Sequence, residues 1–203
     1  AIPADREVIH ILPQEYIVDN QRGIADPLGM AGVRLEVKVH IVTGAVTSAQ
    51  NIVRSCHRSQ LEVSDIALES LASAKAVLTE EERELGVALV DIGGGTSEVA
   101  LISMTGIAVS QSVRVAGDAM NLAVQHYLRE VFRLEVGENT AENVKKILGA
   151  ALPQNNSLRL EVSGKDLVYG GPRVVTVTEG DICEALHDPV QAVVDTVLRA
   201  LEK

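Results

Sequence analysis

A glycine-rich turn between two apolar segments is the part of this sequence whose residue types could do chemistry. Residues 87–99 read Val-Ala-Leu-Val-Asp-Ile-Gly-Gly-Gly-Thr-Ser-Glu-Val, so an acid, three glycines and a threonine separate two strand-like runs. Glycines lack the Cβ atoms that would keep backbone N–H groups away from phosphate oxygens. The turn therefore predicts phosphate binding by Gly93, Gly94, Gly95 and Thr96, with a hydrated divalent cation held by the carboxylate of Asp91.

An ordinary glycine-rich β-turn is the alternative interpretation of this segment. It accounts for a pair of glycines but gives no reason for the acid before them or the threonine after them. Other nucleotide-binding loops fit less well, because no G-x-x-x-x-G-K-[ST] pattern occurs and Ser97–Ile102 continues as a strand-like run rather than a helix. A Rossmann or P-loop domain is therefore not expected.

The composition bounds the class of protein. With 203 residues, 46% of them hydrophobic, the chain can bury a sizeable core, and with only 2% aromatic residues that core consists of Val, Leu, Ile and Ala. An α/β fold follows. The net charge of −10 repels nucleic acid, so no nucleic-acid partner is expected. Cys56 and Cys183 give no disulfide framework, and no apolar run approaches the roughly 20 residues that span a bilayer.

The first part of the chain reads as a small sheet with packed helices. We expect strands at 6–12, 16–18 and 33–42, a break at Thr43-Gly44, a helix at 45–58, a strand at 61–68, a helix at 69–78 and a solvated loop at 79–84.

In the second part we expect a hairpin over 86–115, helices from 117 and over 140–148, a hairpin of 158–162 with 173–177, and a terminal helix from 178, kinked at Pro189. Asn139 or Thr140 with Glu142 resembles a capping box, and Gly149 is the expected stop of that helix. The terminal helix should bury one apolar stripe, formed by Ile182, Leu186, Val190, Val194, Val197 and Leu201.

Asp-Ile-Gly-Gly-Gly-Thr resembles the second phosphate loop of the actin, sugar-kinase and heat-shock-chaperone superfamily, whose members close two lobes over ATP. Residues 1 to about 100 also resemble FtsA, a family of bacterial division proteins related to actin that tethers the FtsZ ring to the membrane. That resemblance rests on Ile9–Tyr16, Gly32–His40 and Leu71–Val87. Beyond the glycines the chain is similar to MreB, the cell-shape family of actin homologues, in Ser112–Asp118, Thr140–Lys145 and Glu184–Leu186.

The resemblance implies a partial actin-like ATPase fold of the α/β class with a small FtsA-type α+β subdomain inserted. That subdomain would span residues 1–62, where FtsA contacts filament neighbours and other division proteins. Residues 63–85 would be the remainder of the first lobe, and 86–203 the second lobe, with a small sheet at about 136–178. The superfamily's first phosphate loop and late adenine loop have no counterpart in this sequence. We therefore expect the chain to carry only part of the nucleotide-binding site.

The resemblance also implies roles for residues outside the turn. Glu142 and Lys145 stand where the superfamily helix contacts ribose and adenine, and their spacing puts both on one helix face; a surface ion pair is the alternative. Gly117 and Asp118 would also bind the nucleotide, or form only a turn and a helix N-cap.

Glu69 stands where MreB has a carboxylate that orients the attacking water, which makes it the candidate catalytic residue. The alternative for Glu69 is a helix N-terminal acid that is favoured by the helix dipole.

These resemblances predict an actin-like cytoskeletal protein of bacterial cell division. It would bind ATP with Mg²⁺, show weak or no ATPase activity, and link the FtsZ ring to the membrane and to other division proteins. Expected partners are further copies of itself in filaments, FtsZ and other division proteins, and a membrane only through a tail that is absent here. The expected location is the cytoplasm, at the cytoplasmic face of the inner membrane. The alternatives are an MreB-type rod-shape filament ATPase and a small-molecule kinase of the same superfamily.

Overall fold

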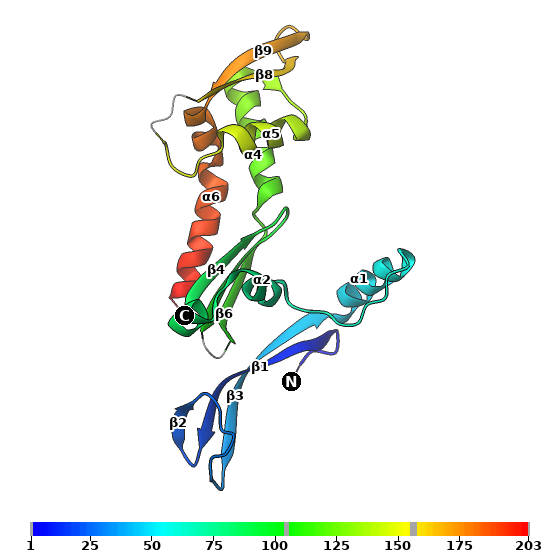
Figure 1. Ribbon diagram of the computed structural model, residues 1–203. Coiled ribbons are helices and arrows are strands. Elements are labelled where there is room, and N and C mark those ends of the chain that lie inside the picture. Colours follow the sequence, from blue (N-terminus) through cyan, green and yellow to red (C-terminus); the bar gives the residue numbers. More distant parts are fainter. Residues whose placement is uncertain (1, 104–105, 155–157, 203) are drawn as a thin grey trace. The chain divides into compact units, whose positions relative to one another are not determined.

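The computed structural model describes residues 2–103, 106–154 and 158–202 (Figure 1). Its contacts divide the chain into two compact units, which are described one at a time. The first unit holds the residues up to Asp91 together with Val99–Ser110, and the second holds Ile92–Glu98 together with Gln111–Glu202. One boundary therefore falls directly after Asp91, inside β4 (Val87–Ile92) and two residues before the first glycine of the turn.

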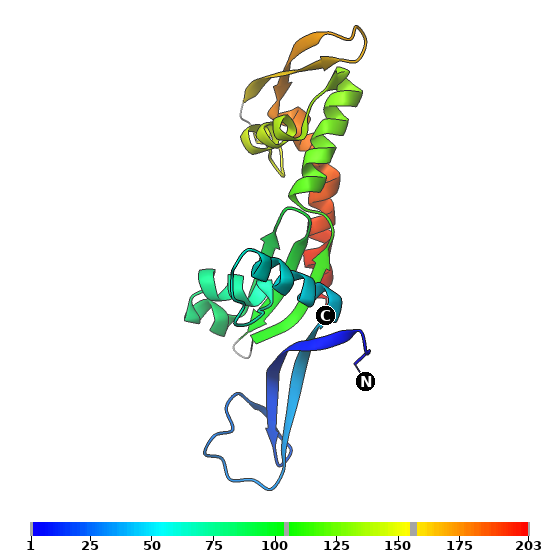
Figure 2. The same ribbon diagram turned by 90° about the vertical axis from the view of Figure 1, so that its right-hand side faces the viewer.

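The first unit begins with an antiparallel sheet in the order β2-β1-β3. Its strands are β1 (Arg6–Val18), β2 (Gln21–Ile24) and β3 (Leu35–Ala45). In both views β1 and β3 run side by side as a long ribbon (Figures 1 and 2).

Two details of this ribbon differ from the sequence prediction. The expected strands 6–12 and 16–18 are one strand, because a shift of register between Pro13 and Glu15 lets β1 run through a residue that has no amide hydrogen. Thr43 and Gly44 do not end β3, since Val8 and Glu7 of β1 lie opposite them.

Three helices follow in the first unit: α1 (Val46–Arg58), α2 (Glu69–Val77) and α3 (Glu80–Leu85). The predictions of α1 and α2 are confirmed. The predicted strand 61–68 is wrong, because this segment joins no sheet and the Leu68 amide donates a hydrogen bond to Nε2 of His10 instead.

The prediction of a loop at 79–84 is also wrong. A capping box starts α3: Thr79 Oγ1 accepts from the Glu82 amide at 3.2 Å, and the Glu82 carboxylate accepts from the Thr79 amide at 2.8 Å. The Thr79 amide and, second, the Thr79 hydroxyl both donate to the Glu82 carboxylate, and these two hydrogen bonds lower the pKa of Glu82. A charged run therefore forms a helix here because its first turn satisfies its own amides.

A second sheet has the order β4-β5-β6, with β4 (Val87–Ile92), β5 (Ser97–Ser103) and β6 (Gly106–Val113). It confirms the predicted hairpin. Along β4 half-buried and exposed residues alternate, with Val87, Leu89 and Asp91 on the half-buried side. Val87 and Leu89 pack against a buried cluster that includes Ala74 of α2.

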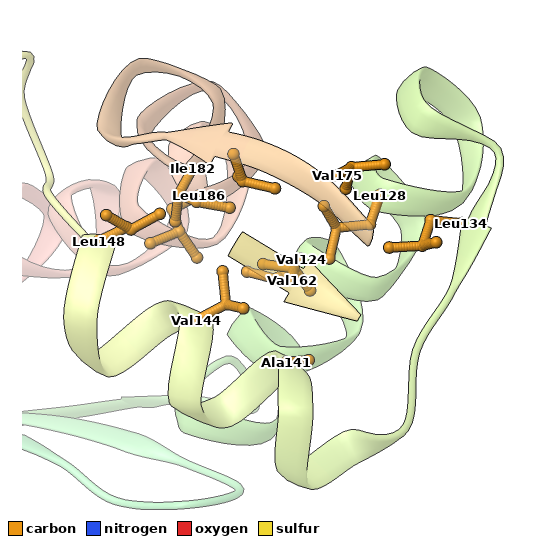
Figure 3. Close-up of a cluster of buried hydrophobic side chains, with 11 residues drawn as sticks. Val124, Leu128, Leu134, Ala141, Val144, Leu148, Val162, Val175, Ile182 and Leu186 are labelled. Atoms are coloured by element: carbon orange, nitrogen blue, oxygen red, sulfur yellow. The ribbon is translucent and has the colours of Figure 1, made fainter. Parts of the chain in front are cut away.

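The second unit contains α4 (Gly117–Phe132), α5 (Glu138–Leu148), α6 (Glu179–Leu201) and a sheet of the order β7-β8-β9. The strands are β7 (Leu134–Glu135), β8 (Arg159–Asp166) and β9 (Pro172–Thr178). The predicted helices and the hairpin of β8 and β9 are confirmed. The core of this unit is formed by side chains from all of these elements, as Figure 3 shows. Its buried members are Val124, Leu128, Leu134, Ala141, Val144, Leu148, Val162, Val175, Val177, Ile182 and Leu186.

The helix caps and the stripe of α6 correct the prediction in detail. The N-cap of α5 is Gly137, without a side-chain cap, so the capping box predicted with Glu142 is wrong. Gly149 does end α5.

On α6 the buried positions after Leu186 are Pro189, Val193, Thr196 and Ala200, each one residue earlier than predicted. Alternating steps of three and four keep a stripe on one face, whereas repeated steps of four drift around the helix. The helix continues through Pro189, and the kink stays a prediction.

Among the described residues, no helix is both long enough and apolar enough to cross a membrane.

We expect Gly164→Ala to reduce the free energy of unfolding of the second unit by about 1–3 kcal/mol, the usual cost of overpacking. A Cβ at Gly164 of β8 would lie 2.5 Å from the carbonyl oxygen of Glu135 and 2.8 Å from Cγ of Leu134. The measurement is a urea titration followed by circular dichroism. Gly171→Ala is the matched control in the adjoining loop, because its Cβ would meet no atom within 4 Å. Equal effects of the two substitutions would contradict the packing explanation.

Candidate nucleotide-binding site

The glycine-rich turn lies between β4 and β5 and is closed by its own backbone. The amide of Gly93 donates to the carbonyl oxygen of Thr96 at 3.0 Å. Gly93 to Thr96 are all exposed. The amides of Gly94 and Gly95 make no hydrogen bond within the described residues, and both residues are exposed, so two N–H donors of the turn have no protein partner there. Two free adjacent amides in a fixed turn can receive an anion.

The start of α4 holds the turn in place. The amide of Gly117 donates to the carbonyl oxygen of Gly93 at 3.1 Å, and the amide of Asp118 donates to that of Gly94 at 2.8 Å. Two amides at the helix N-terminus, which have no partner inside the helix, are thus satisfied by the turn. A Cβ at Gly117 would lie 3.3 Å from the Gly93 oxygen and 3.7 Å from Cα of Gly94, so glycine permits this close approach.

The Asp118 carboxylate lies beside the turn. Both of its oxygens are 3.6 Å from the place where a Cβ on Gly94 would stand. The N-cap of α4 is Ala116 and no side chain caps it, so the alternative interpretation of Asp118 as an N-cap is wrong. A carboxylate beside the turn repels a bare phosphate that binds there, and a cation between them removes that repulsion.

Lys145 reaches from α5 to the start of α4. Its Nζ donates to the carbonyl oxygen of Gly117 at 3.0 Å, and the side chain is half-buried. Lys145 therefore supports the residue on which the turn rests.

Glu142 takes a different partner, since its carboxylate lies 2.7 Å from Nζ of Lys146. The hydrogen bond from Lys146 is the main cause that lowers the pKa of Glu142. The predicted residues Glu142 and Lys145 thus share α5, but each has its own partner.

Asp91 and Glu69 belong to the first unit. Asp91 is the fifth residue of β4, and Oγ of Ser73 on α2 donates to its Oδ2 at 2.7 Å. Glu69 is the first residue of α2, exposed, at a helix start where no side chain provides a cap. This position suits an acid on dipole grounds alone, so the structure leaves both interpretations of Glu69 open.

The sequence reasoning missed Ser73. Its signal was present, because Ser73 stands four residues after Glu69 on one helix face and Asp91 stands on the inward side of a strand. Within the ranges that the structure describes, no three His, Cys, Asp or Glu side chains are grouped closely enough to hold a metal ion by themselves.

Two family sequence models match consecutive parts of the chain. The model of the MreB/Mbl protein family matches residues 46–203, which is well over half of the chain. The model of the SHS2 domain inserted in FtsA matches residues 1–43. The predicted resemblance to FtsA at the start and to MreB further on is confirmed.

The similar curated proteins include cell division proteins FtsA. The protein of Pseudomonas aeruginosa is 54% identical over 129 residues, which are 64% of this chain and 31% of that protein. The protein of Borreliella burgdorferi is 40% identical over 153 residues, which are 75% of this chain and 35% of that protein. The chain thus spans about a third of the length of these relatives.

Solved structures show the fold. MreB5 of Spiroplasma citri bound to ADP superposes with a TM-score of 0.60 at 22% identity, over 93% of this chain and 70% of that one. A chain of the PilM–PilN type IV pilus biogenesis complex gives a TM-score of 0.62 at 14% identity, over 99% of this chain and 46% of that one. The predicted actin-like ATPase fold is confirmed. The chain therefore belongs to the MreB/Mbl protein family, and its residues 1–43 match the model of the SHS2 domain inserted in FtsA.

Proposed function

We propose that this chain is part of an actin-like scaffold of bacterial cell division whose assembly responds to ATP and Mg²⁺. The observation that carries the proposal is the turn with its two free amides, at Gly94 and Gly95, held on the start of α4 by two backbone hydrogen bonds. Because the turn is already ordered, binding a phosphate there costs little further conformational entropy.

The parts of the nucleotide would be held by different residues. The amides of Gly94 and Gly95 and the hydroxyl of Thr96 would bind phosphate oxygens, with Gly93 and Gly117 shaping the turn. Asp91 would hold a hydrated Mg²⁺, an ion that keeps most of its waters and takes one or two carboxylates. MreB5 of Spiroplasma citri, which has this fold, was crystallised with ADP and with AMPPNP. That neighbour supports a nucleotide as the ligand.

Charge supports the requirement for a metal ion. Asp118 places a negative charge beside Gly94, where it would oppose the charge of a triphosphate. Lys145 would contact the base or ribose while it supports Gly117, and Glu142 would accept from the ribose. Glu69 would orient water for a slow hydrolysis, with turnover weak or absent.

The FtsA relatives support cell division as the process, and the residues matched by the SHS2 model support a surface for partners. We propose as partners further copies of this chain, FtsZ and other division proteins, at the cytoplasmic face of the inner membrane. The subdomain limits 1–62, 63–85 and 86–203 are part of this proposal. An MreB-type filament ATPase is the second candidate, which the match of the MreB/Mbl model over residues 46–203 favours.

The first test is Asp91→Ala in the full-length protein. We expect the affinity for ATP in the presence of Mg²⁺ to fall about tenfold or more, the usual effect of losing a group that orients a metal site. Isothermal titration calorimetry measures it. Asp188→Ala, which removes a carboxylate that is 98% exposed, is the charge-matched control and should bind as the unsubstituted protein does. Unchanged affinity of the Asp91 variant would count against the site.

Gly95→Ala separates phosphate binding from an ordinary turn. A Cβ at Gly95 would meet no atom within 4 Å and the φ angle is not positive, so stability should not change. A bound phosphate would meet that methyl group, and losing one hydrogen bond to a charged group costs about 1.5–3 kcal/mol, so affinity should drop at least about tenfold. The melting temperature and the ATP titration are measured on the same sample. If neither changes, the turn has only a structural role.

Capture of purified FtsZ by the immobilised full-length protein distinguishes the two candidate functions. The division scaffold retains FtsZ, and the retained fraction falls in excess salt if charged contacts contribute. An MreB-type protein retains none and instead forms ATP-dependent filaments that sediment. The second result would replace the first candidate by the second.

A further inference from the structure

Ser73 on α2 makes a contact with Asp91 that the proposed function does not yet use. Its Oγ donates to Oδ2 of Asp91 at 2.7 Å, in a partly buried setting. The two residues are 18 positions apart and lie on different elements, α2 and β4. Hydrogen bonds of this length to a carboxylate are among the stronger ones in proteins.

Two other hydroxyls inside helices, those of Ser55 and Thr196, behave differently. Ser55 donates to the carbonyl oxygen of Asn51 at 2.9 Å, and Thr196 donates to that of Ala192 at 2.8 Å. Both bonds go to the residue four positions earlier, the usual local partner of a helical hydroxyl. Ser73 bonds to the side chain of Asp91 instead, so its contact connects two elements.

The packing explains why the two side chains meet. Ala74 of α2 is buried in a cluster that Val87 and Leu89 of β4 pack against. Asp91 follows on the same side of β4, because successive side chains of a strand alternate between its faces. The hydroxyl next to Ala74 therefore reaches the first polar group beyond the apolar part of β4.

We propose that Ser73 is a positioning residue for the bound Mg²⁺: it fixes the Asp91 carboxylate so that Oδ1 can accept from the water shell of the ion. This rests on the proposed function, in which Asp91 holds the hydrated ion. A carboxylate has about four acceptor positions on two oxygens, so the bond at Oδ2 leaves room for two or three further donors. An anchored carboxylate loses less rotamer freedom when the ion binds.

The same contact fixes which face of α2 lies toward β4. Glu69 precedes Ser73 by four residues, so the two side chains project from the same face of the helix. The Ser73–Asp91 hydrogen bond thus keeps the candidate water-orienting acid and the candidate metal carboxylate on one pair of packed elements.

The test is Ser73→Ala in the full-length protein, with ATP affinity measured by calorimetry over a series of Mg²⁺ concentrations. We expect the Mg²⁺ concentration for half-maximal enhancement of ATP binding to rise about tenfold, at the low end of effects seen for groups that orient metal ligands. Affinity for ATP in EDTA should not change. Since alanine favours a helix, the variant should fold, with its melting temperature lowered slightly by the loss of this hydrogen bond.

Two variants serve as controls. Ser70→Ala makes the same change one turn earlier, at a buried hydroxyl that has no hydrogen-bond partner among the described residues, and should leave the Mg²⁺ dependence unchanged. Ser73→Thr keeps a hydroxyl and should restore most of the dependence. In a double variant, Ser73→Ala should weaken Mg²⁺-dependent ATP binding no further than Asp91→Ala does alone, because the serine acts only through that carboxylate.

The outcomes separate this inference from the function on which it rests. If Asp91→Ala abolishes the Mg²⁺ effect while Ser73→Ala binds as the unsubstituted protein does, Ser73 has no positioning role and the site stands. If Ser70→Ala and Ser73→Ala weaken binding equally, or if the two losses at Ser73 and Asp91 add up, the effect is general packing and the inference is wrong. If the unsubstituted protein shows no Mg²⁺-dependent ATP binding, both proposals are wrong.

Discussion

The close approach of a glycine turn to the first residues of α4 is the constraint on which the candidate site depends. Two amides of the helix donate to two carbonyl oxygens of the turn, and this brings Gly117 so near to Gly93 and Gly94 that a side chain would crowd them. The carbonyl oxygens of Gly93 and Gly94 accept from the helix, while the amides of Gly94 and Gly95 have no partner among the described residues. The same hydrogen bonds that give the first amides of α4 their partners thus hold the turn in a form that can bind an anion.

The sequence predicted those features that follow from local patterns. The strand–glycine–strand order and the spacing of apolar residues were sufficient for β4, β5, α4, α5 and the hairpin of β8 and β9. Tertiary partners decided the rest. The segment 61–68, predicted as a strand, joins no sheet, and its Leu68 amide bonds to a histidine side chain instead. The acidic run at 79–84 becomes a helix through one capping box.

The residues of the candidate site can likewise be separated into those that a local pattern predicts and those that only tertiary contacts identify. The residues of the turn were predicted because three glycines between an acid and a threonine are typical of a phosphate-binding loop, and Lys145 was predicted from the family resemblance. Neither route could show that Lys145 bonds to Gly117 while Glu142 pairs with Lys146, because a helix face offers several partners at equal spacing. Ser73 was missed although it shares a helix face with Glu69, because this spacing does not say which strand the face meets; the packing of α2 on β4 identifies Asp91 as its partner.

The structure also explains how an FtsA-type segment and an MreB-type segment can share one chain. The match to the SHS2 model ends at residue 43, and the match to the MreB/Mbl model begins at residue 46. This junction lies where β3 ends, at Ala45, and α1 begins, at Val46. The ribbon before this point is stabilised mainly within itself, by eleven paired positions of β1 and β3. Among the described residues, Gln14 and His10 make side-chain hydrogen bonds to β6 and to the segment before α2, and Leu12 packs against the buried cluster of Ala74. A ribbon that pairs mainly with itself can be exchanged as a segment without altering the hydrogen bonds that hold the turn on α4.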